Sequence, residues 1–249
     1  MQYKFSLEEF IKYHLVPRSW YASYRHKKEY RKGEPEFRML PFLVDKNKNS
    51  IDVGANKGTY TVALAKLSKK VFAFEPNPKM FAFLKKNSPS NAEVFSCALS
   101  DKTRQETLRI PLGRKGKLSN QGASLNPNNI QKNFLPIQVD CKKLDDFNLK
   151  DIGFIKIDVE GFEKEVLMGA EKTLKREKPT LLIEMEERHT KRSILSDIKW
   201  IEGLGYKGFA LFDGKLQSLE FFDSGIHHND AWTGNKKDYI FNFIFLAQP

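Results

Sequence analysis

Residues 51–60, IDVGANKGTY, join the end of an apolar run to the start of an amphipathic one. Gly54 and Gly58 allow a sharp backbone turn and a close approach to a ligand. A helix that begins after such a turn presents free N–H groups, which favour negative charge. The pattern is typical of a strand–turn–helix unit that binds a nucleotide-like ligand. A plain turn that only caps the helix would have the same residues.

The turn differs from the dinucleotide fingerprint GxGxxG, because Asn56 stands where the second glycine would be. It also has an acid, Asp52, two residues before Gly54. A carboxylate at this place repels a pyrophosphate and attracts an amino or sulfonium group. The turn therefore suits S-adenosylmethionine better than NAD.

An acid also ends the second apolar run. Glu75, followed by Pro76, lies 21 residues after the first glycine of the turn. At this offset a carboxylate accepts ribose hydroxyls in nucleotide-binding folds. The third run ends at Ala98 and Leu99, whose side chains suit the border of an adenine ring. The end of a core strand explains Ala98 and Leu99 equally well.

Three carboxylates follow the fourth apolar run in the segment KIDVEGFE. Asp158 and Glu160 lie at the expected carboxyl end of a central strand, where open parallel sheets bind ligands. Glu163 fits the first turn of the next helix, where acids are favoured. Glu184 and His189 follow the fifth run at the same edge, and His189 equally fits an exposed loop.

Short apolar runs alternate with amphipathic stretches from residue 50 onward. The predicted strands are 50–53, 71–74, 93–98, 154–157 and 180–185. The predicted helices are 59–68, 78–87, 163–177 and 192–204. This alternation predicts an α/β, doubly wound, mostly parallel sheet with helices on both faces. Residues 104–139 interrupt it as an insertion, a hairpin follows around Asp213-Gly214, and the run 239–246 predicts an antiparallel edge strand.

The chain has 249 residues and a formal net charge of +11. Residues 12–32 hold seven Lys and Arg against one Glu, so more than half of the charge is local. This part belongs to a basic helical extension, residues 1–33, that precedes a domain over 34–249. We expect the segment either to dock on an anionic membrane or glycolipid or to pack on the domain as a solvated helix.

Two cysteines, Cys97 and Cys141, are too few for a disulfide framework, and the first residues lack an apolar targeting core. A reduced, cytoplasmic protein is therefore expected, with the basic segment allowing peripheral contact with the inner membrane surface. Nucleic acid is not an expected partner, because no RNA-binding module accompanies the charge. The sequence indicates no oligomeric state.

Five segments together resemble the FkbM-type family of S-adenosylmethionine-dependent methyltransferases. They are IDVGANKGTYT (51–61), FEPNP (74–78), ALSD (98–101), KIDVEGFE (156–163) and LLIEMEE (181–187). The resemblance implies the seven-stranded, Rossmann-like fold of class I methyltransferases. It also implies O-methylation of a sugar hydroxyl in a glycan, glycolipid or related small molecule.

The resemblance implies a role for each matching residue. The methionine end of the cofactor would be held by the first turn, through Asp52, Gly54, Asn56 and Gly58. Glu75 would hold the ribose, Ala98 and Leu99 would border the adenine, and Asp158 would lie near the transferred methyl.

A sugar hydroxyl is a weak nucleophile, so we expect a general base. The candidates at the sheet edge are Asp158, Glu160, Glu184 and His189, with the later pair His227 and His228 as further ones. The loop 225–232 suits stacking on a sugar ring or is an ordinary surface loop. A divalent metal held by the three carboxylates is an alternative. An RNA methyltransferase and a non-catalytic cofactor-binding module are the rival functions.

Overall fold

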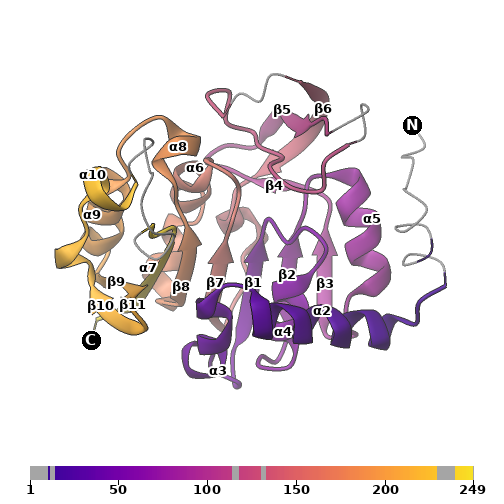
Figure 1. Ribbon diagram of the computed structural model, residues 1–249, viewed down its shortest axis with the longest axis horizontal. Helices are drawn as coiled ribbons and strands as arrows, with labels where there is room; N and C mark the ends of the chain where they lie inside the picture. Colours follow the sequence, from indigo (N-terminus) through magenta and orange to yellow (C-terminus); the bar gives the residue numbers. More distant parts are fainter. Residues whose placement is uncertain (1–10, 12–14, 114–117, 130–132, 229–238, 249) are drawn as a thin grey trace.

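The computed structural model describes residue 11 and residues 15–113, 118–129, 133–228 and 239–248. Its main sheet has eight strands in the order β10-β9-β11-β8-β7-β1-β2-β3 (Figure 1). Their bounds are β1 (Asn49–Val53), β2 (Val71–Phe74), β3 (Ala92–Phe95), β7 (Ile152–Ile157), β8 (Thr180–Glu184), β9 (Tyr206–Phe212), β10 (Lys215–Ser218) and β11 (Asn242–Ala247). β3, β2, β1, β7 and β8 pair in parallel, which confirms the mostly parallel sheet.

The sheet ends in antiparallel strands, as predicted, but with one strand more than seven. β11 pairs antiparallel with β8 on one side and with β9 on the other, so the run 239–246 lies inside the sheet. The outermost strand is β10, which returns from β9 through the predicted hairpin. The hairpin adds the eighth strand, because the residues after the turn pair antiparallel with β9, from Lys215 opposite Phe212 to Ser218 opposite Phe209.

Helices cover both faces because the strand residues alternate between two cores. Val71 packs with residues of η1 (Pro35–Met39), α3 (Leu40–Leu43) and α4 (Thr59–Ala65). Phe72 and Phe74 pack into the opposite core, which includes α6 (Glu163–Met168), α7 (Glu171–Glu177) and α9 (Leu195–Gly203). This period of two is that of a strand buried on both sides.

The predicted helix 163–177 is two helices, α6 and α7, with Gly169 between them. A side chain at Gly169 would lie 1.9 Å from the carbonyl oxygen of Ser100. The close approach of these two backbones requires a glycine at the junction, a tertiary contact that sequence periodicity does not show. α5 (Pro78–Asn87) has the predicted bounds, and the short helices α8 (Glu187–Thr190) and α10 (Ser224–His227) flank α9 in the sequence.

The insertion and the short strand before it form a second sheet in the order β4-β6-β5. Its strands are β4 (Ala98–Leu99), β5 (Arg104–Pro111) and β6 (Phe134–Lys142). The predicted strand 93–98 therefore ends at Phe95, and Ala98 and Leu99 pair with β6 instead. This small sheet lies beyond the upper ends of the parallel strands in Figure 1.

The described part of the N-terminal extension packs on the domain through α2 (Arg18–Lys32), which begins directly after Pro17. α2 lies across α4 in Figure 1, and His26 contacts Phe37 of η1 edge to face. Its outer side exposes Trp20 and Tyr24. Among the described residues, no helix has the length and apolar character needed to span a membrane.

Candidate active site

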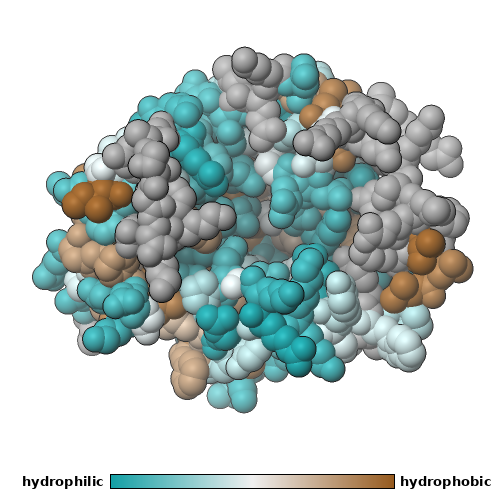
Figure 2. Space-filling view, viewed as in Figure 1, coloured by the Kyte–Doolittle hydropathy of each residue, from teal (hydrophilic) through white to brown (hydrophobic). Residues whose placement is uncertain are grey.

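A cavity of about 310 Å³ lies at the carboxyl ends of β1, β2, β7 and β8. The roof loop, residues 118–129 of the insertion, covers it from above. Figure 2 shows mainly hydrophilic residues around a hollow on this face. The predicted residues that line the cavity are Gly54, Asn56, Glu75, Pro76, Ala98, Leu99, Asp158, Glu160 and Glu184. Segments far apart in the sequence thus meet where ligands bind in open parallel sheets.

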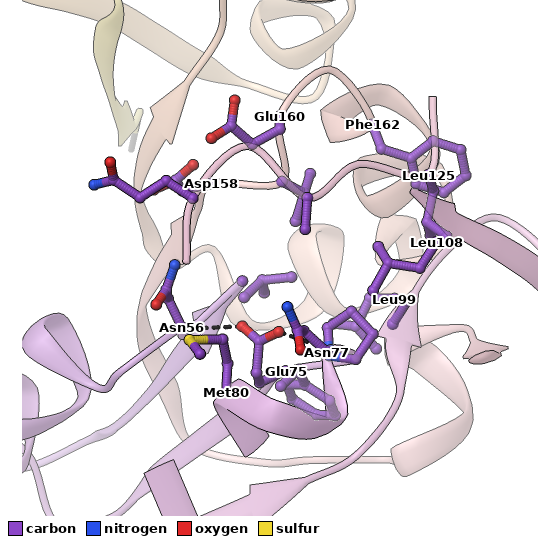
Figure 3. Close-up of a pocket in the computed structure, with 18 of the residues that line it drawn as sticks. Asn56, Glu75, Asn77, Met80, Leu99, Leu108, Leu125, Asp158, Glu160 and Phe162 are labelled. Carbon is purple, nitrogen blue, oxygen red and sulfur yellow. Dashed lines mark hydrogen bonds between the residues drawn. The ribbon is translucent and has the colours of Figure 1, made fainter. Parts of the chain in front are cut away.

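Glu75 is held in place by two backbone N–H groups. Asn56 donates to Oε2 at 2.6 Å and Asn77 donates to Oε1 at 2.8 Å (Figure 3). Each carboxylate oxygen can accept a further hydrogen bond, so the side chain is fixed and still able to bind hydroxyls. Burial raises the pKa of Glu75 to about 7, although the two N–H groups oppose the shift.

The first turn brings Gly54 and Asn56 to the cavity. Gly54 has a φ of +77°, and a Cβ there would lie 1.8 Å from the carbonyl oxygen of Asp158. Asn56, also left-handed, uses its Nδ2 to donate to the carbonyl of Asn120 in the roof loop at 2.8 Å. The turn therefore joins β1, β7 and the roof loop.

Two of the predicted cofactor-binding residues of the first turn do not line this cavity. Gly58 precedes α4 with a φ of +80°, and a Cβ there would lie 2.6 Å from Leu84 of α5. Asp52 is buried beneath the turn, where it accepts a hydrogen bond from the Thr61 hydroxyl, and burial raises its pKa to about 6. The structure thus gives Gly58 a packing role and places Asp52 on a neighbouring cavity.

The side of the cavity opposite the acids is apolar (Figure 3). Sequence patterns indicated Ala98 and Leu99 there but gave no signal for the other apolar residues. Those are Leu108, Leu125 and Phe162, while Met80 lines the cavity beside Glu75 (Figure 3). Leu108 and Leu125 come from the insertion, whose path over the sheet no strand periodicity reveals.

The acidic side is shaped by a strained turn after β7. Glu160 has a φ of +56°, which a residue with a side chain rarely adopts, and such strain persists where the surroundings impose it. Its carbonyl accepts hydrogen bonds from Ser124 Oγ at 2.6 Å and Asn129 Nδ2 at 2.9 Å. Gly122 donates its N–H to Glu160 Oε1 at 3.2 Å. The roof loop therefore fixes both backbone and carboxylate of Glu160.

The carboxylates differ in protonation. Burial, followed by the charge of Asp158, raises the pKa of Glu160 to about 7 and that of Glu184 to about 9. Glu163 accepts the N–H of Gly161 at 2.8 Å, and burial raises its pKa to about 8. Glu163 does not line the cavity, so its geometry is that of a residue that stabilises the turn.

His189 lies behind the cavity wall. Its Nδ1 is 3.4 Å from Glu160 Oε2 and 3.7 Å from Glu186 Oε1. Burial lowers the pKa of His189, so the ring is neutral near pH 7. It can contact Glu160 but, in this arrangement, not a ligand in the cavity.

The later histidines lie elsewhere. His227 and His228 are buried and pack against the Phe222 ring, and His228 also contacts Tyr239. Neither lines the cavity, so the structure does not bring them to the predicted site. The rest of the predicted sugar-stacking loop, residues 229–232, lies outside the described residues.

Lys156 is a site residue that the sequence did not indicate. Its side chain is only 1% exposed, its Nζ lies 3.9 Å from Asp158 Oδ2, and it also lies over the Tyr60 ring. Despite burial, the charges of Asp158, Glu184, Glu34 and Asp52 raise its pKa. A buried cation thus compensates part of the acidic charge.

The carboxylates do not have the arrangement of a metal site. Within the described ranges, no three His, Cys, Asp or Glu side chains gather closely enough to hold one ion. Asp158 has an ammonium group beside it instead. The predicted ligand set of Asp158, Glu160 and Glu184 therefore does not fit a metal here.

Two curated methyltransferases are similar in sequence to part of this chain. The chain is 28% identical to Methyltransferase 1 of Beauveria bassiana, over 48% of this chain and 57% of that protein. It is also 28% identical to the 2-O-methyltransferase NoeI of Sinorhizobium fredii, over 50% of this chain and 58% of that protein. The chain thus spans less than two thirds of the length of these relatives.

A solved structure shows the same fold. The methyltransferase FkbM from Methylobacillus flagellatus matches with a TM-score of 0.50 and 18% identity, over 96% of this chain and 57% of that one. The family model for the methyltransferase FkbM domain matches residues 52–208, which include the first turn, Glu75, the insertion and the acidic turn. The chain therefore belongs to the FkbM methyltransferase family.

Proposed function

We propose that the protein transfers a methyl group from S-adenosylmethionine to a hydroxyl oxygen of a sugar-containing acceptor. The observation that carries this proposal is one cavity with three parts. A preorganised carboxylate, Glu75, lies between an apolar side and a group of acids with raised pKa values. A nucleoside fits the first two parts, and a reaction that removes a proton fits the third.

The nucleoside would lie between Glu75 and the insertion. The ribose hydroxyls would donate to the lone pairs of Glu75 that Asn56 and Asn77 leave available. The adenine would lie against Ala98 and Leu99. Because backbone N–H groups already hold Glu75, binding costs little side-chain ordering.

S-adenosylmethionine supplies an electrophilic methyl group on a sulfonium. The surroundings of Asp158 favour a positive charge, because the partly ionised Glu160 lines the same cavity. Asp158 lies at the strand end closest to the first turn, with its carbonyl against Gly54. It therefore suits the stabilisation of the sulfonium, and the family resemblance implied a place for Asp158 near the transferred methyl.

Glu160 is the best placed general base. Its pKa of about 7 leaves much of it ionised at neutral pH and still basic enough to take a proton. The new bond would join the acceptor oxygen to the methyl carbon, the sulfur–methyl bond would break, and the hydroxyl proton would pass to Glu160. Glu184, with a pKa of about 9, is protonated at pH 7 and can donate a hydrogen bond to the acceptor. His189 orients Glu160 from behind.

An oxygen acceptor is further supported by two features. One relative is named as a 2-O-methyltransferase. In addition, the fourth strand ends in Asp158-Val159-Glu160-Gly161 rather than in the Asn/Asp-Pro-Pro-aromatic run typical of amino-methylating enzymes. Both favour a hydroxyl over a base nitrogen.

Methyl transfer from labelled S-adenosylmethionine to pools of glycans and glycolipids tests the proposal. We expect label in an O-methyl sugar, and we expect Glu160→Gln to lower kcat about 100- to 1,000-fold, within the range of general base catalysis. Binding of S-adenosylhomocysteine should change less than twofold. The matched control is Glu171→Gln on the surface of α7. Label in RNA, or equal turnover by both variants, would contradict the proposed acceptor or the base.

A further inference from the structure

A second cavity, about 460 Å³ in volume, adjoins the first one. Gly54, Asn56 and Asp158 line both, so they form the boundary between them. Its other side is formed by Thr59 and Tyr60 at the start of α4 and by residues of α2. The second cavity thus continues the first one beneath the N-terminal helix.

α2 lines this cavity with Glu29 and, one turn earlier, with Arg25. Its guanidinium donates a hydrogen bond through Nη2 to the Thr59 hydroxyl of α4. Its Nε is buried and has no hydrogen-bond partner within the part of the chain that the structure describes. A buried guanidinium N–H without an acceptor is costly, so an anionic ligand at this place would remove the cost.

The second cavity contains charges of both signs. Arg25, Lys57 and Lys156 supply positive charge. The acids are Glu29, Glu34, Asp52 and Asp158. Of these acids, Glu34 and Asp158 also line the first cavity. Such a site is complementary to a zwitterion, since an ammonium group can face the shared acids while a carboxylate faces the guanidinium.

The family resemblance places the amino-acid end of the cofactor at the first turn, which lines the second cavity, and we propose that Arg25 of α2 pairs with the carboxylate of that end. This rests on the proposed function, because it takes the nucleoside to lie in the first cavity. A ligand with a nucleoside at one end and an α-amino acid at the other would extend past Gly54 and Asp158. Arg25 precedes the residues 52–208 that match the family, so α2 adds a cofactor contact from outside the matched region.

Titration calorimetry of the full chain with two ligands tests this assignment. S-adenosylhomocysteine has the amino-acid end, whereas 5′-methylthioadenosine has the same nucleoside and a thioether but no amino-acid group. The variant is Arg25→Gln. The control is Arg31→Gln, the same charge change at an exposed residue of the same helix. Melting by circular dichroism compares the folding of the variants.

Arg25→Gln should weaken S-adenosylhomocysteine at least about tenfold, the effect of losing one charge-assisted hydrogen bond. It should change the affinity for 5′-methylthioadenosine less than twofold, and Arg31→Gln should change the affinity for neither ligand. Arg25→Lys should recover part of the affinity, because it keeps the charge but not the planar group.

Three results would overturn the assignment. One is an unchanged affinity of Arg25→Gln for S-adenosylhomocysteine. Another is an equal loss for both ligands, which would mean that Arg25 only holds α2 against α4. The third is a wild-type protein that binds neither ligand, and this result alone would also overturn the proposed function.

Discussion

Replacing Glu75 by Gln changes the centre of the nucleoside site while keeping its shape. Glu75 already accepts N–H groups from Asn56 and Asn77, so a ligand hydroxyl must use the remaining lone pairs. Gln replaces one acceptor oxygen by a donor group and removes the charge. The loss of one charge-assisted hydrogen bond corresponds to about 1.5–3 kcal/mol. We therefore expect the affinity for S-adenosylhomocysteine at pH 8 to fall about 10- to 100-fold.

The same carboxylate makes binding depend on pH. Burial raises the pKa of Glu75 to about 7, so the group is largely ionised at pH 8 and largely protonated at pH 6. Protonation removes the charged acceptor, and the affinity of the wild type should weaken as the pH falls through 7. Asp52 and Glu160 have pKa values in the same range, so they also contribute to the pH dependence of the affinity. The contribution of Glu75 is the difference between the pH dependence of the wild type and that of Glu75→Gln.

Titration calorimetry at pH 8 and pH 6 measures both effects. The control is Glu93→Gln on β3, where the carboxylate is half exposed and pairs with Lys70 at the surface. It should leave affinity and slope unchanged. The role of Glu75 in the nucleoside site would be refuted if Glu75→Gln, shown to be folded by circular dichroism, bound S-adenosylhomocysteine within twofold of the wild type at pH 8 and its affinity changed with pH in the same way.

Three further changes follow from the structure. Gly54→Ala should lower the free energy of unfolding measured in urea by about 2–5 kcal/mol, because it combines a left-handed conformation with a clash against Asp158. Gly214→Ala, which is left-handed but in open space, should lower it by about 1–2 kcal/mol. Equal losses of stability in the two variants would contradict the clash. Lys156→Met should lower the free energy of unfolding by about 3 kcal/mol at pH 8 and by less at pH 5, where the neighbouring acids take up protons. Lys175→Met, at an exposed position, should lower it by less than about 0.5 kcal/mol. A loss of stability for Lys156→Met that does not depend on pH would contradict the electrostatic role. The basic outer side of α2 should bind anionic vesicles in co-sedimentation, and Trp20→Ala with Tyr24→Ala should reduce this binding; equal sedimentation with neutral vesicles would argue against docking.

The sequence predicted those parts of the site that lie at strand ends. Gly54, Glu75 and Asp158 follow apolar runs, and the carboxyl ends of parallel strands meet at one edge. Their offsets along the chain were therefore enough to bring them together. The parallel order of the strands followed from the same alternation.

Other parts depend on tertiary contacts that no local pattern shows. Leu108 and Leu125 reach the cavity because the insertion folds over the sheet, and Lys156 is buried although lysines are mostly exposed. Gly58 has the expected left-handed conformation, but the lack of a side chain there leaves room for Leu84 rather than for a ligand. His227 and His228 lie in a segment whose composition indicated a polar loop, yet both pack against aromatic rings.

Titration of the wild-type chain with S-adenosylhomocysteine tests the assignment of the cavity most directly. We expect one molecule to bind per chain, more tightly at pH 8 than at pH 6, with competition by 5′-methylthioadenosine. If no binding heat or thermal stabilisation appeared at millimolar ligand while the protein was folded, the cavity between Glu75 and Asp158 would not be a cofactor site.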